Sequence, residues 1–175
     1  MADLGVYFRR EDYAPFWLRV VIDIVDGATF GIWCIAVGAL AFAINASPRT
    51  GLNAAVLLWV VSAFLYFVIL KRSSFRTLGY RICEVKVVAL DGGVPSYGSL
   101  FLRVMFSIFS PLNWLDLIWL SSDPHRQALR DKFANTYVVK TKAQAVGGGR
   151  VILRPYEILF FNFLFREVEK SPAPK

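Results

Sequence analysis

Two long apolar runs dominate the first half of the chain and predict membrane-spanning helices. The first extends over about residues 16–45 and the second over about 52–71. Each reaches the roughly 20 residues that an α-helix needs to cross the bilayer core. The intervening stretch contains Ser47, Pro48 and Gly51 and is typical of a turn. We therefore expect an antiparallel hairpin of two transmembrane helices.

A third apolar region, at about residues 99–121, contains several polar residues and a proline. A full crossing would put the basic segment that follows on the opposite side of the membrane from the basic loop that precedes it, against the positive-inside rule. Pro111 allows another arrangement, in which two short helices meet as a re-entrant or interfacial hairpin. The sequence favours this broken segment, and a simple third span is the alternative.

Two short stretches have the character of strands rather than helices. Residues 82–88 alternate in part and are rich in β-branched side chains, and they end at Asp91-Gly92-Gly93. Residues 136–139, with the sequence Thr-Tyr-Val-Val, are a second candidate. Pairing of the two would form a small β-hairpin-like element on one side of the membrane.

The ends of the chain are expected to lie outside this core. Residues 1–15 form a short polar leader, and residues 16–140 would be the membrane domain. The glycine-rich residues 141–150 resemble a flexible linker. Residues 151–175 mix apolar and charged side chains, which predicts a C-terminal interfacial helix or a partner-docking segment. The predicted fold is thus an all-α integral membrane fold with a small β-containing element.

Composition strengthens the membrane interpretation. The 175 residues are 56% hydrophobic and 19% charged, with a mean hydropathy of +0.48, whereas soluble domains are about 45–50% apolar and about 25% charged. The net charge of +7 is better explained by basic residues that flank membrane segments than by nucleic-acid binding. The positive-inside rule places the basic loop at 71–103 and the N-terminus in the cytoplasm, where the basic face would meet anionic lipid headgroups.

A stripe of ionisable residues interrupts the first apolar run. Arg19, Asp23 and Asp26 are spaced i, i+4 and i+7, so a helix gathers them within an arc of roughly 60°. Such groups are costly at membrane depth and persist when they pair or face water. We favour a structural ion-pair network, with a proton- or cation-carrying carboxylate as the alternative. The candidate counter-charges for Asp26 are Arg81, Arg103 and Arg126.

Two further groups of polar residues are candidate sites. Asn113 and Asp116, near the break at Pro111, could coordinate a cation as discontinuous helices do in transporters, or could simply lie at the membrane edge. A second group fits a short helix of alternating charge: Arg126, Gln127, Arg130 and Asp131. It could bind lipid headgroups or phosphate, or it could tie the chain back onto the hairpin.

Little in the sequence indicates catalysis or a cofactor. The chain has two cysteines and one histidine, and no Cys-x-x-Cys motif or metal-ligand cluster. No nucleophile is paired with a base in a recognisable motif. We therefore expect a non-enzymatic protein without a metal or cofactor.

These motifs resemble those of the RDD family of membrane proteins, named for one arginine and two aspartates near the first helix. Here they correspond to Arg19, Asp23 and Asp26. The resemblance continues at Thr77-Leu78-Gly79-Tyr80-Arg81 and at 85–96, and it closes with Arg126–Asp131 and Asn135–Val139, so that it covers roughly residues 13–140.

The resemblance implies a multi-pass protein of the bacterial cytoplasmic (inner) membrane. Some members are described as cation/proton antiporters and others as partners in membrane assemblies. We expect an accessory or scaffold subunit that binds other membrane proteins or its own copies, because two or three spans are few for an autonomous carrier. The alternative is a cation/proton antiporter, or another small-solute transporter, that uses the intramembrane aspartates.

Overall fold

The computed structural model describes residues 4–44, 47–108, 116, 119–120, 123, 126–158 and 161–170. The helices are η1 (Arg10–Asp12), α1 (Phe16–Ile44), α2 (Pro48–Phe64), η2 (Leu65–Leu70), α3 (Leu78–Ile82), α4 (Tyr97–Ile108) and α6 (Leu129–Phe133). The strands are β1 (Leu4–Tyr7), β2 (Val85–Ala89), β3 (Thr136–Lys140), β4 (Gly147–Ile158) and β5 (Phe161–Lys170). The chain divides into two compact units: one is Trp17–Cys83, and the other combines Met1–Phe16 with Glu84–Lys175. The domain boundaries predicted from the sequence stay a prediction.

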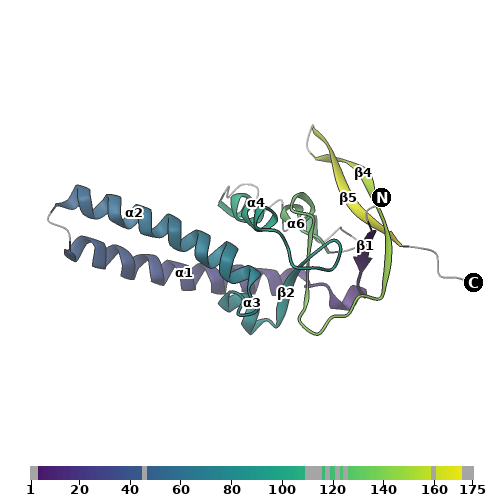
Figure 1. Cartoon of the computed structure of the whole chain (residues 1–175), viewed down its shortest axis with the longest axis horizontal. Helices are drawn as coiled ribbons and strands as arrows, with labels where there is room; N and C mark the ends of the chain where they lie inside the picture. Colours follow the sequence, from purple (N-terminus) through teal and green to yellow (C-terminus); the bar gives the residue numbers. More distant parts are fainter. Residues whose placement is uncertain are drawn as a thin grey trace, which may run out of the picture. The chain divides into compact units, whose positions relative to one another are not determined.

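The first unit is built on the helical hairpin of α1 and α2, which lie side by side (Figure 1). Ser47 caps the start of α2 by accepting a hydrogen bond from the backbone N–H of Thr50, and Pro48 occupies the first turn, where its missing N–H costs nothing. Trp59 joins the two helices: its indole N–H donates to the Cys34 carbonyl at 2.8 Å. Its ring packs against Gly38, where a Cβ atom would lie 3.1 Å away.

The end of the second helix is a π-helical turn, η2, that continues directly from α2. Its wider winding accommodates an aromatic cluster with α1: Phe30 stacks on Tyr66 with ring centroids 6.1 Å apart and meets Phe67 edge-on at 5.1 Å. Beyond η2, the Lys71 ammonium lies 4.4 Å from the centre of the Tyr80 ring. Cation–π contact and aromatic packing thus hold the loop after the hairpin against its base.

The second unit contains two antiparallel sheets, with strand orders β1-β4-β5 and β2-β3. Strand β2 pairs with β3 from Val85↔Lys140 to Ala89↔Thr136, which confirms the predicted pairing of the two β-branched stretches. The buried core of this unit combines residues from both sheets and from the start of the chain: Phe8, Tyr13, Val88, Leu90, Tyr137, Val139 and Val168.

The prediction of an all-α fold was wrong, and the error lies mainly after residue 140. The expected C-terminal helix is instead the long hairpin of β4 and β5, paired from Gly149↔Lys170 to Ile158↔Phe161. The apolar side chains at Phe161, Phe163 and Phe165 recur with the period of two that marks a strand. Overall apolar content had suggested an interfacial helix, whereas the period of the pattern was the better guide. The glycines at 147–149 begin β4 and are part of a strand.

The third apolar region is only partly described. Its first part is α4, a helix of 12 residues, and the predicted break at Pro111 lies outside the described residues. In the part of the chain that the structure describes, the helices long and apolar enough to cross a membrane are Phe16–Ile44 and Pro48–Leu70.

Candidate functional site

The buried carboxylate of Asp26 is the hub of a hydrogen-bond cluster in the first unit. Asp26 is 3% exposed and accepts three hydrogen bonds: from the Tyr66 hydroxyl at 3.1 Å, from the Thr77 hydroxyl at 2.7 Å and from the Gly79 backbone N–H at 2.7 Å. These donors come from η2 and from the start of α3, so one side chain joins three elements. All three donors are uncharged, and hydrogen bonds to an ionised acceptor are roughly twice as strong as neutral ones.

The local sequence explains how the chain approaches Asp26 so closely. A Cβ atom at Gly79 would lie 2.6 Å from the Ile22 carbonyl oxygen and 2.9 Å from an Asp26 carboxylate oxygen, so only glycine fits there. Tyr66 also accepts a hydrogen bond from the Leu78 N–H at 3.2 Å, which positions its hydroxyl between α3 and Asp26. We call Asp26, Tyr66, Thr77 and Gly79 the Asp26 clasp.

The other members of the predicted stripe lie on the same helix. Arg19 is buried and Asp23 is half-buried. Arg81, predicted as a counter-charge for Asp26, lies on α3 with an exposed side chain. Within this unit, the sequence motif that contains Arg81 reaches Asp26 through its neighbours Thr77 and Gly79 instead.

In the second unit a similar role falls to Asp116, which is 1% exposed. It accepts a hydrogen bond from the backbone N–H of Arg130 at 2.6 Å, and its other oxygen lies 3.0 Å from the Arg130 side-chain Nε. Arg130 also donates to the Ser107 hydroxyl at 3.2 Å. Asp116 is thus paired with a cation of its own chain. Asn113, its predicted companion in an ion site, lies outside the described residues.

Helix α6 carries three consecutive buried charges: Arg130, Asp131 and Lys132. After Arg130, Asp131 forms a buried ion pair with Arg103 of α4 and accepts a hydrogen bond from the Ala128 N–H at 3.2 Å. Arg103 donates in addition to the Thr136 hydroxyl at 2.8 Å. The ion pair therefore links α4, α6 and the start of β3.

The third charge of α6, Lys132, is fully paired. It lies 2.6 Å from the Asp123 carboxylate and forms a second ion pair with Glu167 of β5. Tyr156 of β4 donates to Glu167 at 2.6 Å. Burial acts to raise the pKa of Glu167, but the hydrogen bonds from Lys132 and Tyr156 outweigh it and hold that pKa below its ordinary value. Burial and the hydrogen bond to Glu167 raise the pKa of Tyr156.

Gln127 and Arg126 complete the predicted basic motif, and Gln127 binds residues next to the same ion pairs. The Gln127 N–H donates to Asp123 at 3.1 Å, and its side-chain amide donates to the Thr136 carbonyl at 3.0 Å. Arg126 is half-exposed and adopts a left-handed backbone conformation with φ of 47°. The structure brings Gln127, Arg130 and Asp131 into internal contacts, and the lipid-binding or tethering role expected of this motif stays a prediction.

Asp26 and Asp116 are bound by two segments with the same order of local structure, residues 77–88 and 128–139. Each consists of an extended residue, a five-residue helix, a left-handed residue and a strand: α3, Glu84 and β2 in one, and α6, Asn135 and β3 in the other. In each, the second helical residue gives its backbone N–H to a buried aspartate, Asp26 or Asp116. The sequence identifies neither this correspondence nor the roles of Tyr66, Lys132 and Glu167, although Thr77 and Gly79 stand in a motif that it singles out.

Within the described ranges, no group of three or more His, Cys, Asp or Glu side chains is arranged to hold a metal ion. The ion pairs and hydrogen bonds join segments that are distant in sequence, so their role is to position these segments.

The two long helices define the class of protein. Both helices, Phe16–Ile44 and Pro48–Leu70, are strongly apolar, and little of either is buried within the protein. Helices so apolar and so little buried belong in a membrane rather than in a soluble core. The sequence model of the RDD family matches residues 13–135, well over half of the chain. The protein therefore belongs to the RDD family and is a membrane protein. Comparisons with curated proteins and with solved structures found no match.

Proposed function

We propose that this protein is a non-enzymatic accessory or scaffold subunit of a larger complex in the bacterial inner membrane, with its N-terminus in the cytoplasm. The observation that carries this proposal is the outer face of the β4–β5 hairpin, which presents apolar side chains to its surroundings. The hairpin follows the residues matched by the family model, so this surface is an addition to the common domain.

The pairing of β4 with β5 separates two faces of the hairpin. Leu153 and Arg166 are partners, as are Pro155 and Leu164, so that their side chains share one face. On this face Leu153 is 63% and Leu164 is 65% exposed. Phe165 on the opposite face is 3% exposed. An exposed apolar pair beside an arginine has the composition of a protein-binding surface.

The buried face of the hairpin is fixed to the family domain. Phe165 packs edge-on against Phe133 of α6 with ring centroids 4.9 Å apart, and Glu167 is ion-paired with Lys132. Since α6 also carries Arg130 and Asp131, the hairpin is joined to the same charged framework as the segments around it. This rigid attachment supports a role in which the hairpin holds a partner at the membrane surface.

The test is purification of the full chain in a mild detergent, with identification of the proteins that accompany it. The double variant Leu153→Asp/Leu164→Asp changes only the outer face, and Val94→Asp is the matched control because Val94 is 64% exposed in a loop of the same unit. We expect one protein to accompany the wild type and the control in a fixed ratio and to be lost from the double variant. Identical sets of proteins in all three preparations would contradict the proposal.

A second candidate function is cation/proton exchange. The observation that favours it is the burial of Asp26 within a candidate span, where it accepts hydrogen bonds from the uncharged groups of Tyr66, Thr77 and Gly79. Exchange requires that Asp26→Asn abolish cation-dependent proton flux in proteoliposomes while the protein stays folded. The scaffold proposal requires that wild-type proteoliposomes show no such flux above empty vesicles.

A further inference from the structure

Residues 77–88 and 128–139 match each other in backbone conformation as well as in their order of elements. The extended residue before each five-residue helix has a ψ of 161° in the first segment and 162° in the second. The left-handed residue after each helix has a φ of 51° in the first and 53° in the second. The two segments can therefore be compared residue by residue.

The paired strands β2 and β3 are related by a local two-fold axis. Val87 and Val138 occupy the same place in the two segments and are also partners in the ladder, so the axis passes through this pair. Equivalent hydrogen bonds close the two ends: the Leu90 N–H donates to the Asn135 carbonyl at 3.2 Å, and the Thr141 N–H donates to the Glu84 carbonyl at 2.7 Å. This symmetry supports a comparison of α3 with α6, position by position.

The face of α6 that carries Lys132 and Phe133 is covered by strand β5. Lys132 forms an ion pair with Glu167, and Phe133 meets Phe165 edge-on with ring centroids 4.9 Å apart. Glu167 and Phe165 are two residues apart on β5, so their side chains lie on one face of the strand. The covering segment is thus an extended chain with an aromatic ring and a carboxylate at this spacing.

On α3 the same two positions are taken by Arg81 and Ile82, again a cation followed by an apolar side chain. Lys132 is 1% exposed on α6, whereas the Arg81 side chain is exposed and Ile82 is 60% exposed. Leu78 is also exposed, whereas its equivalent Leu129 is buried. The chain therefore carries this combination of a cation and apolar side chains twice, and the residues that the structure describes cover only the one on α6.

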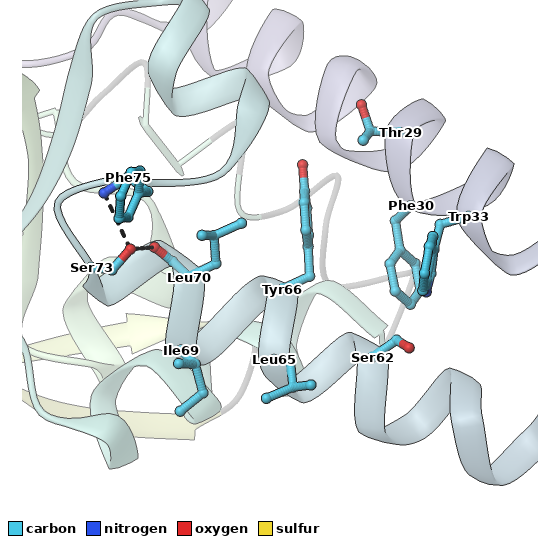
Figure 2. Close-up of a pocket in the computed structure, with 10 residues that line it drawn as sticks. All are labelled: Thr29, Phe30, Trp33, Ser62, Leu65, Tyr66, Ile69, Leu70, Ser73 and Phe75. Carbon is cyan, nitrogen blue, oxygen red and sulfur yellow. Dashed lines mark hydrogen bonds between the residues drawn. The ribbon is translucent and has the colours of Figure 1, made fainter.

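The exposed face belongs to a helix that is held in place. The Asp26 clasp fixes the start of α3. In the loop before it, the Ser73 hydroxyl donates to the Leu70 carbonyl at 2.7 Å and accepts a hydrogen bond from the Phe75 N–H at 3.2 Å, as the dashed lines in Figure 2 show. A partner would meet a preorganised surface, which lowers the entropic cost of binding.

We propose that the outer face of α3 binds an extended segment of a partner protein that carries a carboxylate two residues from an aromatic side chain. Leu78, Arg81 and Ile82 are spaced i, i+3 and i+4, so they share one face of the helix. The aromatic ring packs on Ile82 and the carboxylate pairs with Arg81, as Phe165 and Glu167 do with their partners on α6. This surface lies within the residues matched by the family model, and it does not depend on the outer face of β4–β5.

The test is photo-crosslinking of the full-length protein in intact membranes, with a photoreactive phenylalanine analogue at Ile82. We expect one discrete adduct with another protein, whose crosslinked peptide contains an aromatic residue and a carboxylate at this spacing when it is sequenced by mass spectrometry. Ile24 is the matched control position, because it is 64% exposed on α1 of the same unit, and it should not give this adduct. An adduct with lipid alone, with a second copy of this chain or with a peptide that lacks this pattern would overturn the proposal.

Variants of Arg81 test the ion pair in the same crosslinking background. Arg81→Glu should reduce the adduct about tenfold, because it replaces a charged hydrogen bond with repulsion, whereas Arg81→Lys should retain it. Both variants should unfold at the wild-type temperature in detergent, since this side chain is exposed. A lysine in place of the partner's carboxylate should restore the adduct of Arg81→Glu. An adduct that is insensitive to Arg81→Glu, or that the paired charge change does not restore, would contradict the assignment.

The hairpin variant separates this surface from the one proposed on β4–β5. Leu153→Asp/Leu164→Asp should keep the adduct from position 82, because it alters only the outer face of the hairpin. Loss of the adduct in that variant would mean that the hairpin, rather than α3, holds the partner.

Discussion

The backbone N–H of Gly79 donates a hydrogen bond to the carboxylate of Asp26, 53 residues earlier in the chain, over 2.7 Å. With the hydroxyls of Tyr66 and Thr77, this bond holds the loop after the helical hairpin onto the first turns of the hairpin. A buried carboxyl group bound in this way is a fixed part of the framework, because its release would leave buried polar oxygens without donors. Asp116 is held in the same way by the backbone N–H of Arg130.

The close approach at Gly79 makes the clasp sensitive to a single methyl group. Gly79→Ala places a Cβ atom against the Ile22 carbonyl and the Asp26 carboxylate, so we expect a clear loss of thermal stability in detergent. Gly31→Ala is the control: nothing described lies within 4 Å of a Cβ there, and alanine is favoured over glycine in a helix by about 0.5–1 kcal/mol. Equal stability of the two variants would show that the loop does not dock on Asp26.

Thr77 tests the strength of the clasp without a steric change. Thr77→Val keeps the shape of the side chain but removes a donor to a buried carboxylate, which should cost about 1.5–3 kcal/mol of unfolding free energy. Thr29→Val, which loses only a hydrogen bond within its own helix, should cost less. Reversible unfolding of the two variants, followed by circular dichroism in one detergent, compares them directly. A larger loss for Thr29→Val would refute the assignment.

The buried pair of Arg103 and Asp131 is a second anchor. Arg103→Met leaves Asp131 without its cation and should destabilise the protein by about 3–5 kcal/mol, as expected for a broken buried pair. The double variant Arg103→Met/Asp131→Leu should recover part of that loss, because neither charge is then stranded. A double-mutant cycle measured by thermal unfolding gives the coupling energy. Additive losses would mean that the two charges do not interact.

Glu167 makes the attachment of the β4–β5 hairpin dependent on pH. Its pKa is lower in the folded protein than its ordinary value of 4.5. The resulting stabilisation is therefore complete above that value and is lost as the pH falls through the lowered pKa. Glu167→Gln should remove this part of the acid sensitivity, whereas Glu157→Gln, at an exposed position on the same hairpin, should keep it. The measurement is the unfolding midpoint between pH 6 and pH 3, and identical acid profiles for the two variants would contradict the role of Glu167.

Local patterns in the sequence predict much of the fold. The length of the two apolar runs is enough to predict the helical hairpin, because a spanning helix requires about 20 apolar residues. Two runs of β-branched residues are enough to predict the pairing of β2 with β3. The stripe of Arg19, Asp23 and Asp26 identifies the buried aspartate because an ionisable residue in an apolar helix is unusual. These features depend on residues close together in the chain.

The partners of that aspartate could not be predicted in the same way. Charge alone suggests an arginine for Asp26, whereas the donors are two hydroxyls and a backbone N–H that only the folded loop brings together. The pairing of Lys132 with Glu167 depends on the β4–β5 hairpin. The high apolar content of residues 151–175 led to the prediction of a helix there, so this pairing was missed. Long-range contacts of this kind follow from tertiary structure rather than from local composition.

If the outer face of β4–β5 binds a protein partner, photo-crosslinking in intact membranes should capture that partner. A photoreactive phenylalanine analogue is placed at Leu164 and, as the control, at Val94. We expect one discrete crosslinked protein from position 164 and none from position 94. A correctly folded protein that forms no protein adduct from position 164, or that forms the same adduct from both positions, would contradict it.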